Sequence, residues 1–187
     1  MERAEEALRA GRLVVIPTDT VYGVAALPGV AEDLFAAKGR PEDKAIPVLG
    51  ARAADLESIA EFDERATRIA ARFWPGPLTL VLPRAPGFTV DLGGIDAETV
   101  AVRVPAHDVA LELLDRSGPL AVTSANRSGE PAATTVHHAR AALGDAVAVY
   151  VDAGECGGAP STVASLVGEL RLLRPGPVDE EGLRRSL

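Results

Sequence analysis

The sequence predicts an α/β fold in which helices pack on one twisted, mixed β-sheet, within a single domain that covers residues 1–187. Short apolar runs alternate irregularly with segments whose apolar residues recur at helical spacing, a mixture typical of one sheet flanked by helices. Apolar residues make up 47% of the chain, which is enough to bury a full core at this length. No repeat, low-complexity segment or linker divides the chain, and the tail over about 177–187 is expected to be peripheral.

In the first half of the chain, a helix over 63–74 carries the strongest pattern. Asp63 is expected to be its N-cap, apolar residues share one face, and Pro75-Gly76-Pro77 prevents its continuation. Residues 18–23 are interpreted as a hydroxyl-rich turn that comes before the helix expected from about Ala31 to Lys38. The remaining helices of this half are expected over residues 2–10, 31–38 and 53–59, and strands over 13–16, 46–49 and 78–82.

In the second half, one helix is expected from Asp108, its cap, through Arg116, and another from a Thr134 or Thr135 cap to Gly144. Residues 83–94 form the longest irregular piece and are a candidate lid. Strands are expected over residues 99–104, 120–122, 147–151 and 170–173.

Charge and composition exclude several classes of protein. A formal net charge of −8 argues against binding of nucleic acid by bulk electrostatics, so any tRNA contact should be weak and local or made through a partner. The single cysteine, Cys156, cannot form an intrachain disulfide, and no apolar run approaches membrane-spanning length. With the charged segment at residues 2–6, these features lead us to expect a soluble, cytoplasmic protein without a membrane role.

Three polar segments are candidate sites. Residues 123–129 follow an apolar run and offer hydroxyl and amide groups, although a Ser/Asn-rich turn at a strand end has the same composition. The threonines that flank Asp19 suit a small polar ligand or a turn that binds its own backbone. Between residues 38 and 44, three cations in a bent loop suit either phosphate binding or a solvated helix end.

Other chemistry finds little support in the sequence. The glycine-rich loop at 154–160 is followed by no Walker-type lysine, which excludes a P-loop. His107, His137 and His138 lack zinc-ligand spacing, so no metal site is expected. Ser124 and Ser161 lack the glycines of a nucleophile elbow.

Taken together, seven segments resemble the YrdC family of single-domain threonylcarbamoyl-adenylate synthases, in order and over nearly the whole chain. They are Ile16-Pro17-Thr18-Asp19-Thr20-Val21-Tyr22-Gly23, Lys38-Gly39-Arg40-Pro41, Trp74-Pro75-Gly76-Pro77-Leu78-Thr79, Val102-Arg103-Val104-Pro105, Ser124-Ala125-Asn126 with Ser128-Gly129, Ser161-Thr162-Val163 and Arg174-Pro175-Gly176.

The resemblance implies a YrdC-like sheet with a concave ligand cleft. It also implies synthesis of threonylcarbamoyl-AMP and pyrophosphate from L-threonine, bicarbonate or carbon dioxide, and ATP, for the N6-threonylcarbamoyladenosine modification of tRNA. Mg²⁺ would arrive with ATP, no organic cofactor is implied, and the partners would be threonylcarbamoyl-transferase proteins that act on tRNA. No protein nucleophile is needed, so catalysis would rest on positioning and charge neutralisation.

The same resemblance implies residue roles. Lys38, Arg40, Ser124 and Asn126 would be the catalytic group, in which the two cations neutralise the triphosphate and the leaving pyrophosphate. Thr20, Arg103 and Val122 would bind L-threonine, Arg103 through the carboxylate. The ATP-binding set would be Arg40, Lys44, Thr99, Ser124, Ala132 and Arg174.

This chain departs from the family pattern at Ala45, Leu49, Ala132-Ala133 and Ser165. Where Ala132 replaces serine, one hydrogen bond worth about 0.5–1.5 kcal/mol is lost, which should weaken nucleotide binding without abolishing it. Two other functions stay open at this point: a nucleotide- or RNA-binding relative without synthase activity, and a relative that processes another carbamoyl adenylate.

Overall fold

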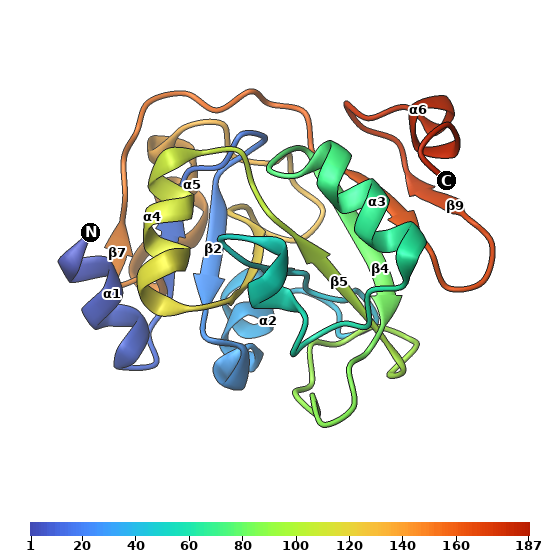
Figure 1. Ribbon diagram of the computed structural model, residues 1–187. Coiled ribbons are helices and arrows are strands. Elements are labelled where there is room, and N and C mark those ends of the chain that lie inside the picture. Colours follow the sequence, from blue (N-terminus) through green and yellow to red (C-terminus); the bar gives the residue numbers. More distant parts are fainter.

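The computed structural model describes residues 1–187 and contains the expected single mixed sheet with helices packed on it (Figure 1). The nine strands lie in the order β7-β1-β2-β6-β3-β5-β4-β8-β9. Their bounds are β1 Val14–Ile16, β2 Gly23–Ala26, β3 Val48–Leu49, β4 Leu78–Pro83, β5 Thr99–Arg103, β6 Leu120–Ser124, β7 Val149–Tyr150, β8 Thr162–Ser165 and β9 Arg171–Arg174.

The helices connect and cover these strands. The α-helices are α1 Glu2–Arg9, α2 Glu32–Lys38, α3 Glu64–Phe73, α4 Asp108–Ser117, α5 Val136–Leu143 and α6 Glu180–Arg184. Three short 3₁₀ turns lie at η1 Pro28–Val30, η2 Ala53–Leu56 and η3 Gly144–Ala146. No helix is long and apolar enough to cross a membrane.

Strand alternation divides the core into two clusters. Residues of one parity, such as Val24, Val102 and Leu80, join α2, α3 and α5 in a large cluster. Residues of the opposite parity, such as Ile16 and Val122, pack under α1 and α4 in a smaller one. The cavity described below lies on this second face, where residues of β6, β3, β5, β4 and β8 line it.

Several predicted helix ends are confirmed by the structure. The Asp63 carboxylate accepts a hydrogen bond from the Ala66 backbone N–H at 2.8 Å and caps α3. Thr135, one of the two expected caps of α5, accepts from the His138 N–H at 3.2 Å. Asp108 was wrong as a cap: it is the first residue of α4, and His107 occupies the N-cap without a side-chain bond.

Other expectations are corrected. The turn at residues 18–23 ends at Gly23, which begins β2, a strand that the sequence analysis did not expect and that pairs with both β1 and β6. Residues 162–165 form a strand that the sequence analysis did not expect, and the short helix expected over 53–59 is a 3₁₀ turn over Ala53–Leu56. The tail also contributes Val178 and Leu183 to the large core cluster.

Residues 83–94, the candidate lid, are held at several points. The Ile46 and Gly94 N–H groups donate to the carbonyls of Leu92 and Glu42, at 2.8 and 2.6 Å. Within the loop, the Arg84 guanidinium donates to the Val90 carbonyl at 2.5 Å. The loop is therefore tied to the segment before β3, and its movement stays a prediction.

Candidate active site

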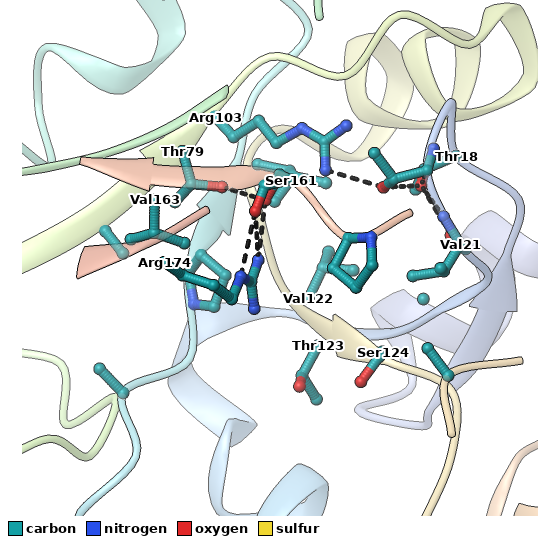
Figure 2. A pocket seen from close by; sticks show the side chains of 18 of the residues that line it. Thr18, Val21, Thr79, Arg103, Val122, Thr123, Ser124, Ser161, Val163 and Arg174 are labelled. Atoms are coloured by element: carbon teal, nitrogen blue, oxygen red, sulfur yellow. Dashed lines mark hydrogen bonds between the residues drawn. The ribbon is translucent and has the colours of Figure 1, made fainter. Parts of the chain in front are cut away.

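A cavity of about 350 Å³ lies on the open face of the sheet (Figure 2). Pairs of residues two positions apart in five neighbouring segments line it, because alternate residues of a strand face the same side of a sheet. These pairs are Pro47 and Leu49, Thr79 and Val81, Ala101 and Arg103, Val122 and Ser124, and Ser161 and Val163. The segments around Thr20, Arg40, Ala132 and Arg174 supply the remaining walls. The sheet thus gathers residues that are far apart in sequence into one site.

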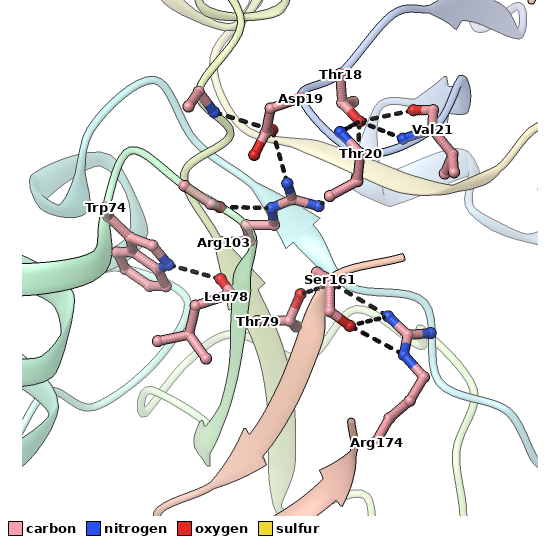
Figure 3. A network of polar contacts seen from close by, with 12 residues as sticks. Thr18, Asp19, Thr20, Val21, Trp74, Leu78, Thr79, Arg103, Ser161 and Arg174 are labelled. Atoms are coloured by element: carbon pink, nitrogen blue, oxygen red, sulfur yellow. Dashed lines mark hydrogen bonds and ion pairs between the residues drawn. The ribbon is translucent and has the colours of Figure 1, made fainter. Parts of the chain in front are cut away.

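Arg103, at the end of β5, is the most buried cation of the cavity wall, with 5% of its surface exposed. Its Nε donates to the Gly76 carbonyl at 3.0 Å, and its two terminal nitrogens donate to Thr20 Oγ1 at 3.0 Å and Asp19 Oδ1 at 2.7 Å (Figure 3). The Asp19 oxygen also accepts from the Ala106 N–H at 3.0 Å. A guanidinium has five N–H donors, so two remain for a ligand.

The turn before β2 is fixed by its own hydroxyl groups. Thr18 Oγ1 accepts from the Thr20 and Val21 N–H groups, both at 3.2 Å, and donates to the Val21 carbonyl at 2.6 Å. Both threonine side chains are buried, and their hydroxyls lie 3.0 Å apart. The turn therefore binds its own backbone, as one of the two interpretations expected. It also places Thr20 in the wall of the cavity.

Ser161 and Thr79 form a polar pair that the sequence analysis did not single out as ligand-binding. Their hydroxyls lie 2.9 Å apart, because β4 and β8 pair in parallel from Leu78 opposite Thr162. Arg174 donates to the Ser161 carbonyl at 3.0 and 2.8 Å and to its hydroxyl at 3.0 Å (Figure 3). Thr79 and Ser161 both lie in the seven segments that resemble the YrdC family, and this resemblance was the only feature of the sequence that could have identified the pair.

Close backbone contact places Arg174 beside this pair. A Cβ at Gly176 would lie 2.4 Å from the Thr162 nitrogen and 2.8 Å from the Pro160 carbonyl oxygen, inside van der Waals contact. Only glycine fits there without a backbone shift. The Arg174-Pro175-Gly176 segment therefore holds β9 against the start of β8.

Arg40 projects from the loop after α2, where Gly39 adopts a left-handed conformation with φ of 57°. Its Nε and terminal nitrogen donate to the Lys44 and Ala45 carbonyls, both at 3.0 Å. Burial lowers the pKa values of Arg40 and Arg174, and neither residue forms an ion pair with a carboxylate. Of the three cavity arginines, Arg103 alone forms an ion pair, with Asp19. The cavity therefore presents two guanidinium groups without an ion pair, which suits an anionic ligand.

Lys38 lies behind the cavity wall and does not line it, so its expected contact with the triphosphate stays a prediction. With 2% of its surface exposed, its ammonium donates to the Ser124 and Asn126 carbonyls and to Asn126 Oδ1 at 3.2 Å. Burial and the nearby Arg40 charge lower the pKa of Lys38 to about 8. Lys38 holds the end of β6 in place because buried ammonium groups need such acceptors.

The expected site residues thus divide into two groups. Thr20, Arg40, Arg103, Val122, Ser124, Ala132 and Arg174 line the one cavity. Lys38, Lys44, Thr99 and Asn126 do not. Lys44 is exposed and offers its carbonyl to Arg40, Thr99 offers its carbonyl to Arg84, and the Asn126 amide donates to the Arg127 and Glu130 carbonyls. These four support the loops around the site.

Metal-ligating side chains do not gather in this structure: no group of three or more His, Cys, Asp or Glu residues could hold an ion. The polar groups of the cavity are guanidinium and hydroxyl donors, with the Asp19 carboxylate turned toward Arg103. The residues present therefore form no cage for a resident cation.

Comparison with known proteins gives consistent matches over the whole cavity-forming region. Residues 6–176 match the model of the Sua5/YciO/YrdC family, which is described as "Telomere recombination". A putative threonylcarbamoyl-AMP synthase of Mycobacterium tuberculosis is 44% identical over 97% of this chain and 86% of its own length. The threonylcarbamoyl-AMP synthase of Pyrococcus abyssi is 44% identical over 96% of this chain, which spans 55% of that longer protein.

A solved structure agrees with these relatives. The crystal structure of P. abyssi Sua5 complexed with L-threonine superimposes with a TM-score of 0.92 at 41% sequence identity. The match covers 98% of this chain and 56% of that one. The order of the seven segments, the sheet that brings them together and the family match over residues 6–176 agree, and the chain belongs to the Sua5/YciO/YrdC family.

Proposed function

We propose that this chain is a threonylcarbamoyl-AMP synthase, which converts L-threonine, bicarbonate or carbon dioxide, and ATP into threonylcarbamoyl-AMP and pyrophosphate. The observation that carries the proposal is the cavity in which Arg40 and Arg174 have no carboxylate partner while Arg103 keeps two free donors. Curated relatives of this name, 44% identical over nearly the whole chain, support it.

L-Threonine binds on the side of the cavity where Arg103 and Thr20 meet. The two spare N–H groups of Arg103 pair with the amino-acid carboxylate, because a planar guanidinium matches a carboxylate in a forked geometry. Val122 and Leu49 line this part of the cavity beside them. The P. abyssi relative, whose structure contains L-threonine, supports this choice of amino acid.

The triphosphate of ATP lies toward Arg40, Arg174 and Ser124, which provide charge and hydroxyl donors on the cavity wall. Mg²⁺ arrives with ATP as part of the substrate, since the chain's own residues offer it no cage. Lys38 acts indirectly, because it fixes the backbone on which Ser124 sits. Lys44, Thr99 and Asn126 support ATP binding only through the loops that they hold.

The reaction needs no protein nucleophile. The neutral threonine amine adds to carbon dioxide with loss of a proton, or reacts with bicarbonate with loss of water, and either route gives a carbamate. The carbamate oxygen then forms a bond to the α-phosphorus of ATP as the bond from that phosphorus to the leaving pyrophosphate breaks. The protein aligns the two substrates and offsets the negative charge that accumulates on the phosphates, the main sources of catalysis in phosphoryl and nucleotidyl transfer. The product passes to transferase proteins that modify tRNA.

The proposal is tested by threonine dependence. Purified protein given ATP, bicarbonate, Mg²⁺ and L-threonine is expected to release pyrophosphate, because the carbamate is the attacking group. Pyrophosphate is measured by a coupled assay and the adenylate by mass spectrometry. Equal release without threonine would contradict the proposal, and adenylate formed from carbamoyl phosphate instead would indicate a different carbamoyl substrate.

Arg174→Ala should raise the KM for ATP about 10- to 100-fold, the loss expected when charged hydrogen bonds worth about 1.5–3 kcal/mol are removed. Arg171→Ala is the matched control, since Arg171 lies on the same strand and, like Arg174, is without an ion pair, but lies outside the cavity. Circular dichroism checks that both variants fold. Equal KM values for the two variants would rule out a phosphate role for Arg174.

Lys38 gives the activity a pH dependence. Because the pKa of Lys38 is lowered to about 8, its ammonium form predominates below that pH and the neutral amine, with only two N–H donors for three acceptors, above it. The ratio of kcat/KM in the wild type to that in Lys38→Met should therefore fall as the pH rises from 7 to 9. This ratio cancels the titration of the substrate amine, and a constant ratio would show that Lys38 does not hold the loop through its charge.

A further inference from the structure

Residues 151–161, here called the strap, join two strands at opposite ends of the sheet. The strap leaves β7 at one edge and enters β8, which lies next to the other edge. Figure 1 shows it as the long orange segment that passes over the upper ends of the strands. Its last two residues, Pro160 and Ser161, line the cavity.

The strap has little slack. Seven strand-to-strand spacings separate β7 from β8 in the sheet order, which is about 34 Å if the sheet were flat. The twelve steps from Tyr150 to Thr162 reach about 40 Å when fully extended. Because the strap must be almost fully extended, the few hydrogen bonds that attach it to the rest of the protein determine its path.

The phenol of Tyr22 is the first of those points. Tyr22 has none of its surface exposed, and its hydroxyl donates to the Gly154 carbonyl at 2.7 Å and accepts from the Ala153 N–H at 3.1 Å. Asp152 reinforces the bend, since its carboxylate accepts from the Gly154 N–H at 3.0 Å. Tyr22 is thus bonded to the strap by both a donor and an acceptor.

The same residue is bonded to two walls of the cavity. The Tyr22 N–H donates to the Ala133 carbonyl at 2.8 Å, and the Ala125 N–H donates to the Tyr22 carbonyl at 2.7 Å. Further along the strap, the Gly158 N–H donates to the Thr20 carbonyl at 2.7 Å. Residues 20–22 therefore link the strap, the turn before β2 and the loop after β6.

We propose that Tyr22 is a positioning residue that fixes the strap against the turn at residues 18–20, which lies on the amino-acid side of the cavity. The inference rests on the proposed function, because it assigns that side to L-threonine. Without the hydroxyl, the strap is held chiefly at Gly158 and Cys156, and the Thr20 backbone, which is bonded to Gly158, is less well fixed. Threonine binding must then supply the ordering that Tyr22 supplies in the native protein.

Tyr22→Phe tests the inference, with Tyr150→Phe as the matched control. The Tyr150 hydroxyl donates to the Gly144 carbonyl at 2.7 Å, so the control removes a tyrosine hydrogen bond that does not involve the strap. Hydrogen exchange of the strap amides should accelerate about tenfold in Tyr22→Phe and stay unchanged in Tyr150→Phe. The KM for threonine should rise about tenfold in Tyr22→Phe, with kcat changed less than twofold.

A second variant guards against a fold defect. Asp152→Ala removes the bond to Gly154 from an exposed position, leaves the core intact and should raise the KM for threonine about threefold. Unchanged strap exchange in Tyr22→Phe, or faster exchange with an unchanged KM, would overturn the inference while threonine-dependent synthesis by the wild type stands. Absence of that synthesis in the wild type, with faster strap exchange in Tyr22→Phe, would instead overturn the proposed function.

Discussion

The buried guanidinium of Arg103 is the interaction on which the site depends. Removing a charge from water is costly unless partners replace the lost hydration, and here three protein groups do so: Asp19, Thr20 and the Gly76 carbonyl. These partners come from the turn before β2 and the corner between α3 and β4. Because each partner must approach the same planar group, the two segments are held at fixed positions relative to each other. The part of Arg103 that is left free lines the cavity.

The cavity is lined by positively charged side chains, although the molecule as a whole is negatively charged. The chain carries a formal net charge of −8, yet the cavity wall holds Arg40 and Arg174 without carboxylate partners. Such a local field favours a small, highly charged anion over an extended polyanion such as nucleic acid, which would meet the acidic remainder of the surface. The strap connects the two sides of the cavity, because its Gly158 is bonded to the Thr20 carbonyl and its Ser161 accepts hydrogen bonds from Arg174.

What the sequence could predict depended on how local each signal was. The α3 helix follows from its Asp63 cap and its apolar face, both contained in one segment. Strand β2 was missed because Gly23 and two alanines carry little strand preference, and its pairing with β1 and β6 creates the strand. The Thr79–Ser161 pair has no local signal either, since the parallel register of β4 and β8 brings it together. The partners of Lys38 had no local signal, because a cation at a helix end can face solvent, ligand or, as here, the carbonyls of a distant loop.

The central claim is that one cavity holds the amino acid and the triphosphate together, on opposite sides. A crystal structure of the protein with L-threonine and a non-hydrolysable ATP analogue tests it most directly. The account predicts the threonine carboxylate on the free donors of Arg103 and the phosphates between Arg40 and Arg174. Phosphates bound away from both arginines, or threonine bound without contact to Arg103, would contradict it.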